Sequence, residues 1–417
     1  MERWFYSDTR DKLEVNQLGK RFLIFGAGFE NKGAQAMIFV TVWNILKQFP
    51  DAEIFLPVTG DGYDEYKFTP LYVDSYGYAY AYGGINAVKN YTVAAVKKML
   101  GRGRSFDNIR NLKELVPTLD AMINISGYNL SSAFSMELNI HYLNMLDLMK
   151  KYNVPYYLMP QSFGPCDYGK KQEYMDRRIK SALSGARLIY AREKDGYQLL
   201  TGRYGLTNVI LAADMVLLSE EIKLADVKSQ AESINVPCLE TQHNVGIIPN
   251  SRNSDIGNEE EIIRVYCRII DTLLRKKRTC YLMVHSSGDA RLCKLIKTHY
   301  LENESVIVIN REFSSFEFNV FVRQFDFLVA SRYHSVVHAY KQAVPCLVLG
   351  WAVKYIEMMR LVGQEVYNLD VRSKESLAKA NEKLNQMLQN YSKEHSIIQT
   401  KMSQLEDNSC FCFLKEL

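Results

Sequence analysis

The sequence alternates short apolar runs with helix-like segments along most of its length, and this alternation limits the folds that the chain can adopt. Residues 21–26 (RFLIFG) predict a buried strand, residues 33–48 a helix and residues 51–57 a second strand. A chain that alternates strands with helices forms a parallel sheet, because each helix returns it to the start of the next strand. We therefore predict an α/β fold.

The alternation falls into two blocks, which indicates two domains in this chain of 417 residues. In the first block, strands are expected at residues 119–125, 154–159 and 186–191, and a helix at 136–152. In the second block, strands are expected at residues 244–248, 280–284, 305–309 and 327–330, and helices at 259–276, 290–299 and 315–324.

The predicted architecture is two Rossmann-like domains that face each other across a cleft. We place the N-terminal domain at residues 1–217, a charged linker at 218–242, the C-terminal domain at 243–373 and a C-terminal helical segment at 374–417.

The composition argues against several classes of protein. The formal net charge of +4 is too small to indicate nucleic acid binding. Residues 1–17 are polar and charged rather than a signal peptide, and no apolar run is long enough to span a membrane. The eight cysteines are scattered without a CxxC pair, which is typical of reduced thiols and argues against a disulfide framework or a zinc ribbon. These features predict a cytoplasmic protein.

The clearest functional signal lies in residues 325–350 (FDFLVASRYHSVVHAYKQAVPCLVLG), where an apolar strand leads through Ser331 into a helix. Arg332 and His334 fall where the strand ends, and ligands bind at the carboxyl ends of strands in open α/β sheets. A helix N-terminus adds free backbone N–H groups and a partial positive charge. With Ser331 as the expected N-cap and Ser335 in the first turn, this segment predicts a site for a small anion. A capped helix start with solvated Arg332 and His334 is the alternative.

His334 and His338 are four residues apart and are expected to share a helix face, a spacing that can begin a zinc site. No HExxH motif and no nearby Cys or Asp ligand completes such a site. We therefore predict no metal, and we expect His338 to pack against the strand that follows the helix.

Polar residues also follow strands of the first domain. They are Asn31 in the glycine-rich turn GAGFENKG, Tyr128 and Asn129 after a later strand, and Gln161 and Ser162 after the next. These turns meet at one edge of a parallel sheet, where converging polar side chains suit sugar hydroxyls. The glycine-rich turn has neither the GxGxxG fingerprint nor the GK[ST] of a P-loop, so on its own it is better explained as a tight strand-to-helix connection.

Arg192 directly follows the strand ARLIYA, a position from which its guanidinium can clamp a carboxylate or a phosphate. A salt bridge to Glu193 or Asp195 is the alternative. His285 follows a strand at the cleft edge of the second domain, where a histidine can act as a general acid or base. A loop or capping histidine is the simpler explanation of that position.

Residues 88–104 contain the basic run NYTVAAVKKMLGRGR, which predicts an amphipathic helix. Such a helix can lie on an anionic membrane, or it can be a solvated helix of the first domain with its basic residues outward. One short helix is a weak membrane signal, so we favour the solvated helix and keep peripheral membrane contact as the alternative.

Taken together, these segments resemble the polysaccharide pyruvyl transferase family of bacterial exopolysaccharide and capsule biosynthesis. The resemblance covers residues 21–367, through the pieces GAGFENKGAQAM, NISGYNL, LMPQSFGP, YAREKDGYQLL, LAADMVLL, VGIIPN, VHSSGD and SRYHSVVHAYKQAVPCLVLG. The last piece resembles the family's Ser-Arg-x-His segment, followed by a small-residue helix and a Val-Pro strand, and it is the most specific.

The resemblance implies a GT-B-like fold and an enzyme that transfers the pyruvyl group of phosphoenolpyruvate to a sugar as a cyclic ketal. Arg332 and His334, with Ser331 and Ser335 beside them, are then expected to hold the donor's phosphate, and Arg192 to be a second donor clamp. No metal, nucleotide or other cofactor is needed for this chemistry. The expected acceptor is a galactose-type residue of a polysaccharide precursor linked to polyprenyl diphosphate, at the inner face of the membrane.

Two departures from the family bear on the expected catalytic residues. Many members have Asp-Glu after the glycine of the first loop, where this chain has Ala34 and Gln35. Some members have a histidine in the segment that matches PQSFGP, where this chain has Gly164. His334 and His285 are therefore the candidate proton donors, and Arg332 completes the expected catalytic group.

Two other functions fit the predicted fold. A GT-B glycosyltransferase would bind the diphosphate of a nucleotide sugar, but such enzymes commonly hold the donor ribose with a Glu, and the helix after Ser331 (RYHSVVHAYKQ) has no acidic residue. A non-catalytic glycan-binding protein would bind sugar without affinity for phosphoenolpyruvate. Neither alternative explains the ordered set of motifs.

Overall fold

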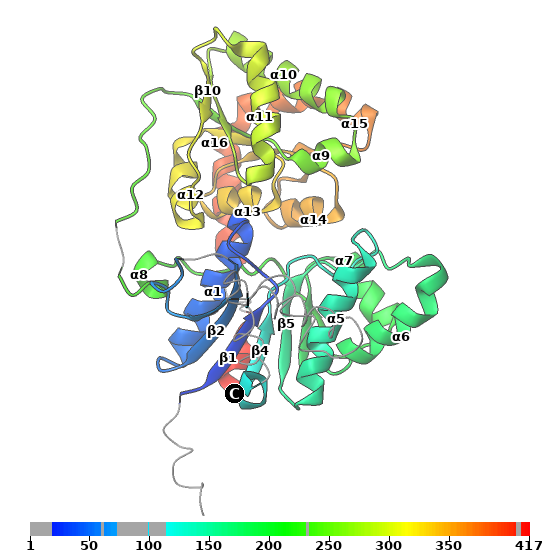
Figure 1. Cartoon of the computed structure of the whole chain (residues 1–417). Coiled ribbons are helices and arrows are strands. Elements are labelled where there is room, and N and C mark those ends of the chain that lie inside the picture. The colour runs from blue at the N-terminus through cyan, green and yellow to red at the C-terminus, as the bar shows by residue number, and fades with distance from the viewer. Residues whose placement is uncertain (1–18, 60–61, 73–98, 100–113, 231–232, 406–409) are drawn as a thin grey trace, which may run out of the picture.

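The computed structural model of the chain describes residues 19–59, 62–72, 99, 114–230, 233–405 and 410–417 (Figure 1). Within these residues the chain forms two α/β domains, each built on a sheet of parallel strands, so the predicted fold class is confirmed. The predicted basic helix at 88–104 lies outside the described residues except for Met99.

The first sheet has the strand order β3-β2-β1-β4-β5-β6-β7. Its strands are β1 (Arg21–Phe25), β2 (Glu53–Val58), β3 (Thr69–Tyr72), β4 (Ala121–Asn124), β5 (Tyr156–Gln161), β6 (Leu188–Ala191) and β7 (Val209–Leu211). β1 pairs with both β2 and β4, with Phe22 opposite Ile54 and Ala121. The strand order reverses at β1, so the loops that follow β1 and β4 diverge and leave room for a ligand.

The helices described around this sheet are α1 (Lys32–Gln48), α5 (Met136–Lys151), α6 (Gln172–Leu183) and α7 (Lys194–Gln198). α1 follows β1 and contacts α12 and α13 of the second domain as well as α8 of the linker, which explains why its sequence is apolar on more than one face. None of the helices in the described part of the chain is long and apolar enough to cross a membrane.

The second sheet has the strand order β10-β9-β8-β11-β12-β13. Its strands are β8 (Asn244–Ile248), β9 (Thr279–Met283), β10 (Val306–Ile309), β11 (Phe327–Ala330), β12 (Cys346–Gly350) and β13 (Asn368–Asp370). The helices are α9 (Ser251–Ile256), α10 (Glu259–Arg275), α11 (Ala290–Lys297), α12 (Ser315–Phe321), α13 (Tyr333–Lys341) and α14 (Val353–Leu361). The order reverses between β8 and β11, and α13 follows β11, so both sheets present a reversal point to the space between the domains.

The chain passes between the domains twice. The predicted linker contains the short helix α8 (Leu224–Val227), and Ser229 N–H donates to the carbonyl of Glu65 in the first domain at 2.8 Å. After α15 (Lys374–Ala378) and α16 (Ala380–Gln404), which pack on the second domain, residues 410–417 return to the first domain. There the ring of Phe413 stacks on Tyr157 with the centroids 4.0 Å apart, and Figure 1 shows the C-terminus beside this domain.

The two domains touch along α1. The ring of Phe39 lies 4.9 Å from that of Phe316 in α12, and the Gln35 side chain accepts a hydrogen bond from the backbone N–H of Ser315 at 3.2 Å. These contacts bring the first turn of α1 next to the first turn of α13.

Candidate active site between the two domains

Two helix N-termini, one from each domain, meet between the sheets. Asn31 caps α1, where its side-chain oxygen accepts from the backbone N–H of Gly33 at 2.8 Å. A Cβ at Gly33 would lie 2.0 Å from Nδ1 of His334 in α13, so only glycine allows this approach. The structure therefore gives Asn31, an expected acceptor ligand, the role of a helix cap.

The first turn of α13 differs from the expected one. Its N-cap is Arg332 rather than Ser331, and no side chain caps it. The Ser331 hydroxyl is fully buried and lies 2.5 Å from the Tyr266 hydroxyl, while the Ser335 hydroxyl donates to the carbonyl of Arg332 at 2.6 Å. Both serines thus hold the turn in place, and their hydroxyls already have partners.

Arg332 is held by a carboxylate from a neighbouring loop. Its guanidinium donates to both oxygens of Asp289, at 2.9 and 2.5 Å. Asp289 is fully buried and also accepts from the backbone N–H groups of Ser251 and Ser286, at 3.0 and 3.1 Å. This bidentate pair fixes the plane of the guanidinium. The Arg332 side chain remains 21% exposed. Arg332 is therefore preoriented, and part of its side chain is still exposed.

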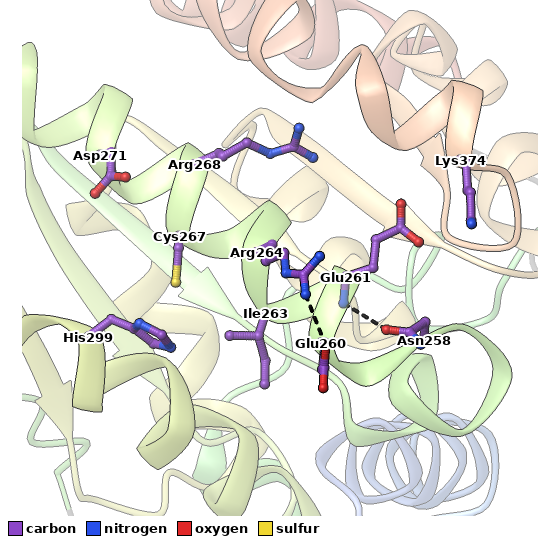
Figure 2. Close-up of a pocket in the computed structure, with 10 residues that line it drawn as sticks. All are labelled: Asn258, Glu260, Glu261, Ile263, Arg264, Cys267, Arg268, Asp271, His299 and Lys374. Atoms are coloured by element: carbon purple, nitrogen blue, oxygen red, sulfur yellow. Dashed lines mark hydrogen bonds and ion pairs between the residues drawn. The ribbon is translucent and has the colours of Figure 1, made fainter.

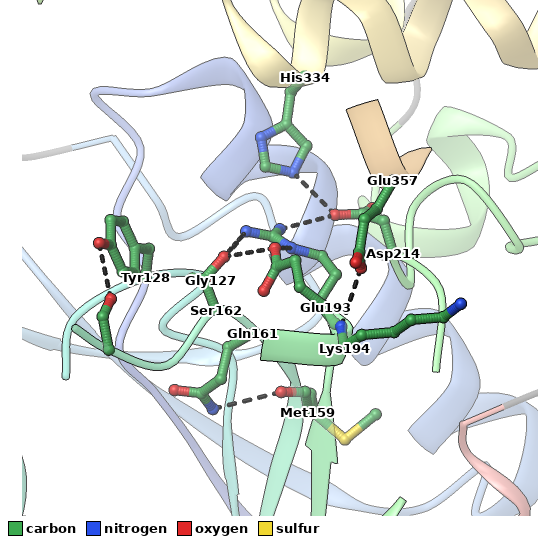
Figure 3. A network of polar contacts seen from close by, with 12 residues as sticks. Gly127, Tyr128, Met159, Gln161, Ser162, Glu193, Lys194, Asp214, His334 and Glu357 are labelled. Carbon is green, nitrogen blue, oxygen red and sulfur yellow. Dashed lines mark hydrogen bonds and ion pairs between the residues drawn. The ribbon is translucent and has the colours of Figure 1, made fainter. Parts of the chain in front are cut away.

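Arg192 is buried in a polar network at the strand ends of the first domain, part of which Figure 3 shows. Its guanidinium donates to Asp214 at 2.9 Å, Glu193 at 3.1 Å, Ser162 at 2.7 Å and the carbonyl of Gly127 at 3.1 Å. It also lies 4.4 Å from the ring centroid of Tyr333, in the second domain. Of the two alternatives weighed for Arg192, the salt bridge is the one observed, with Glu193 and Asp214 rather than Asp195 as partners.

Asp214 joins this network to His334. The Nε2 of His334 lies 3.7 Å from a carboxylate oxygen of Asp214. Burial lowers the pKa of His334 to about 4, although Asp214 opposes this shift. Burial alone would raise the pKa of Asp214, but the neighbouring His334 and Arg192 outweigh it and lower the pKa below its ordinary value. At neutral pH the pair is therefore an ionised carboxylate beside a neutral imidazole.

Lys354 is a site residue that the sequence analysis missed. Its ammonium nitrogen lies among four aromatic rings, with centroid distances of 5.1 Å to Tyr128, 5.2 Å to Tyr333, 5.7 Å to Trp351 and 5.9 Å to Tyr355. Burial, together with the nearby Arg192, lowers its pKa to about 7. Within the described part of the chain, it forms no hydrogen bond or ion pair. Lys354 follows β12, so the rule that strand ends bind ligands would have identified it.

Two further histidines of the second domain, His285 and His338, are buried and neutral. His285 follows β9, packs edge-on against Phe318 with the centroids 5.0 Å apart, and has no hydrogen-bond partner for either ring nitrogen among the described residues. Burial, with His338 and Arg332 nearby, holds its pKa well below the usual value. His338 contacts Asn319 through Nδ1 at 3.2 Å, and burial lowers its pKa to about 3.

The expected acceptor residues of the first domain mostly support one another. Gln161 is fully buried, accepts from the Tyr142 hydroxyl at 2.9 Å and donates to the carbonyl of Met159 at 3.2 Å. Ser162 is buried and donates to Glu193 at 2.7 Å. In this structure neither side chain faces a space that a sugar could enter.

Tyr128 and Asn129 are half-buried at the same edge of the sheet. The Tyr128 hydroxyl donates to the carbonyl of Gly164 at 2.9 Å, which fixes the ring that faces Lys354. Ser126, at the start of the same turn, is buried with its hydroxyl unpartnered among the described residues. At the strand ends of the first domain, the polar atoms without a hydrogen-bond partner thus differ from those expected.

A cavity of about 570 Å³ lies between the domains, and its lining includes Arg192, Asp214, Tyr333 and Lys354. A depression of about 710 Å³ on the outer face of α10 is larger but is lined by solvated side chains such as the Arg264–Glu260 pair at 2.9 Å (Figure 2). Of these two cavities, the one lined by Arg192 and Lys354 is the better site, because it is at the strand ends and contains buried charge. In the described ranges, no three His, Cys, Asp or Glu side chains gather as metal ligands do.

Solved structures with low sequence similarity share this architecture. UDP-GlcNAc 2-epimerase from Methanocaldococcus jannaschii is 13% identical with a TM-score of 0.51, covering 87% of this chain and 92% of the epimerase. MnaA from S. aureus, solved with UDP, is 13% identical with a TM-score of 0.54, covering 95% and 94%. OtsA in its apo form is 11% identical with a TM-score of 0.55, covering 95% and 98%. At these identities the likeness shows the fold alone, which is GT-B-like.

Sequence comparisons identify the family. None of the curated proteins matches this sequence. The model of the polysaccharide pyruvyl transferase family matches residues 31–352, a range that includes the capped turn of α1, the Arg192 network and Arg332 with His334. The chain therefore belongs to the polysaccharide pyruvyl transferase family and is a transferase enzyme.

Proposed function

We propose that this enzyme transfers the pyruvyl group of phosphoenolpyruvate to a sugar and closes it there as a cyclic ketal. The observation that supports the proposal most is the set of cationic and N–H groups at the ends of β11 and β12. Arg332 and the first turn of α13 offer donors for a phosphate, and Lys354 is a cation without a carboxylate partner in the described part of the chain. Phosphoenolpyruvate carries a phosphate and a carboxylate on one carbon, about three negative charges in all.

The balance of charge favours Lys354 over Arg192 as the group that meets the carboxylate of the donor. Arg192 is already paired with Glu193 and Asp214, so a further carboxylate there would face two negative charges. Lys354 lies among aromatic rings and forms no ion pair with a carboxylate among the described residues, and a bound carboxylate would raise its lowered pKa and hold it charged. We therefore assign the phosphate to Arg332 and the α13 N-terminus, and the carboxylate to Lys354.

The reaction begins with protonation of the methylene carbon of the donor, which leaves an oxocarbenium-like carbon. One sugar hydroxyl attacks that carbon, the C–O bond to phosphate breaks, and a second hydroxyl of the same sugar replaces the phosphate to close the ketal. Two hydroxyl protons are released: one balances the proton consumed at the methylene, and the other leaves on the departing phosphate. Fixed cations around the departing phosphate stabilise the charge that develops, a contribution that is usually large in a cleft with little water.

His334 is the better of the two candidate proton donors. His285 is surrounded by His338, Arg332 and His334, all of which disfavour its charged form, so it remains neutral. His334 has Asp214 beside it, which favours the imidazolium, and a bound phosphate dianion would favour it further. The proton therefore goes on His334 when the donor binds.

The decisive assay uses the full chain with phosphoenolpyruvate and a galactose-type acceptor, and it measures phosphate release together with the mass gain of the sugar. We expect both with the wild-type protein, and neither with Arg332→Gln. The matched control is Arg291→Gln, because Arg291 is another arginine of this domain that pairs with a carboxylate, Glu259, but is 67% exposed on α11. Turnover of a nucleotide sugar, with none of phosphoenolpyruvate and any glycan, would reject the proposal.

We further propose that the acceptor is linked to polyprenyl diphosphate, and that the enzyme works in the cytoplasm at the inner face of the membrane. The basic run in residues 88–104 would then meet anionic lipid. Sedimentation with liposomes rich in anionic lipid tests this, with Lys97, Lys98, Arg102 and Arg104 replaced by Gln as the comparison. Equal sedimentation of both proteins would remove the run from the membrane contact.

A further inference from the structure

We propose that Asp214 is a positioning residue that orients the imidazole of His334 for proton transfer, and that this pair forms only when the two domains are together. The inference builds on the proposed role of His334 in pyruvyl transfer. It concerns a contact between the end of the first domain and the first turn of α13, which Figure 3 shows.

Asp214 is held rigidly from three sides. It is 2% exposed and follows β7, where the first domain leads into the linker. One of its oxygens accepts from the backbone N–H groups of Val216 at 2.9 Å and Leu217 at 3.3 Å. The other oxygen accepts from Arg192 at 2.9 Å and faces His334 Nε2 at 3.7 Å. The carboxylate therefore cannot turn away, and one oxygen is directed at the imidazole.

The imidazole of His334 is confined between two elements of the first domain. Its Nε2 is on the side of Asp214, and its Nδ1 is so close to Gly33 that a Cβ there would lie 2.0 Å away. A carboxylate accepts hydrogen bonds, so it selects the tautomer with the proton on Nε2 and leaves Nδ1 facing the first turn of α1. The distance of 3.7 Å is too long for a hydrogen bond, but such catalytic contacts tighten when substrate binds.

The charge around His334 makes Asp214 decisive for its protonation. The titratable groups that face it are Asp214 from the end of the first domain, Arg192 after β6, Lys354 on α14, His338 on its own helix and His285 after β9. Among these groups, Asp214 favours the charged imidazolium, and the cations oppose it. Removing the carboxylate should therefore make His334 harder to protonate as well as less well oriented.

The test that does not depend on turnover is NMR of the full chain with ¹⁵N-labelled histidine, with the His334 signal assigned through His334→Gln. In the wild type we expect the proton of neutral His334 on Nε2. In Asp214→Asn we expect a mixture of tautomers and a titration at lower pH. Gly33→Ala should also give mixed tautomers and a titration at lower pH, because its methyl group displaces the His334 ring from the α1 side without altering Asp214. The control is Asp147→Asn, because Asp147 pairs with Arg178 on the outer helices α5 and α6.

Turnover gives a second readout. Asp214→Asn should lower kcat on the order of 100-fold, the usual contribution of a positioned proton donor, with the Kd of phosphoenolpyruvate nearly unchanged by calorimetry. If Asp214→Asn does not fold, Gly33→Ala provides the same test. Wild-type tautomer and titration in both variants, or an unchanged kcat, would overturn the role of Asp214. A wild-type protein without turnover would instead reject the function, and the NMR result would still decide whether Asp214 orients His334.

Discussion

The two halves of the cleft use their polar side chains differently. In the first domain, Arg192 and Ser162 satisfy each other and their neighbours, so the polar groups around Arg192 form a closed network. In the second domain, Lys354 and three buried histidines keep nitrogen atoms that have no hydrogen bond among the described residues. A buried polar group without a partner costs about 1–3 kcal/mol, so its presence calls for an explanation, and a ligand that pairs with it is one. We therefore expect the second domain to supply the groups that bind the donor and the first domain to support them.

Lys354→Met gives the largest expected effect, because it removes a cation of the cleft that lies among aromatic rings and, within the described ranges, forms no ion pair with a carboxylate. We expect turnover of phosphoenolpyruvate to fall by about 100- to 1,000-fold, as for the loss of one preorganised electrostatic contact. Phosphate release measures it, and Lys170→Met is the control, since Lys170 is exposed on a surface turn of the first domain. Turnover close to that of the wild type would show that the second domain binds phosphoenolpyruvate without Lys354.

Ser162→Ala tests the supporting half. The Ser162 hydroxyl lies between Arg192 at 2.7 Å and Glu193 at 2.7 Å, so its loss leaves two buried charges with fewer partners. We expect the free energy of unfolding to fall by about 2 kcal/mol and the KM for the sugar to stay nearly constant. Urea unfolding and acceptor titration measure the two quantities. The exposed Ser184→Ala is the control, and a large rise in KM without loss of stability would restore the acceptor role of Ser162.

The buried histidines predict how stability depends on pH. Burial lowers the pKa of His338 from 6.5 to about 3, so in the unfolded chain it takes up a proton below about pH 6.5 and in the folded chain it does not. The unfolded state then binds more protons, and stability falls as the pH falls. His338→Gln should reduce this slope by about 1.4 kcal/mol per pH unit between pH 6 and pH 4. Urea unfolding across this range measures the slope, with the exposed His299→Gln as the control, and an unchanged slope would mean that His338 is charged in the folded protein.

Glu312→Gln gives the smallest effect. Lys32 of the first domain has a side chain that is 6% exposed and lies 2.9 Å from Glu312 of the second, whose side chain is 68% exposed. Because solvent screens the carboxylate, we expect a loss of at most about 1 kcal/mol in unfolding free energy, and less in high salt. The Kd of phosphoenolpyruvate should stay constant, since Lys32 belongs to the supporting half. A clearly tighter Kd, measured by calorimetry, would show that the freed Lys32 also binds the donor.

Much of the fold could be predicted from the sequence, because the central strands are continuous apolar runs. β1, β4, β8 and β11 are buried on both faces, and this is where periodicity is most informative. β3, β7 and β13 were missed. They are edge strands of three or four residues, and Ile210 and Leu211 of β7 are exposed, so pairing with a neighbouring strand rather than local sequence determines them.

Only the site residues that directly follow a predicted strand could be placed from the sequence. Arg332 and His334 lie at the strand end that the sequence indicated. The carboxylates that orient them, Asp289 and Asp214, come from other elements, and nothing in the local sequence connects them. Ser331 was wrongly expected to cap α13 because Tyr266, on α10, takes its hydroxyl instead. Tertiary contacts here override the local preference for serine at a helix start.

The return of residues 410–417 to the first domain affects the order in which the protein can be completed during synthesis. Tyr157 and Tyr190 on the first sheet are buried, and Phe413 stacks on the first of them. A ribosome makes the whole second domain before it makes Phe413, so the nascent first domain emerges with this aromatic surface uncovered. Until translation reaches these residues, the first domain exposes an aromatic, hydrophobic patch of the kind that chaperones bind.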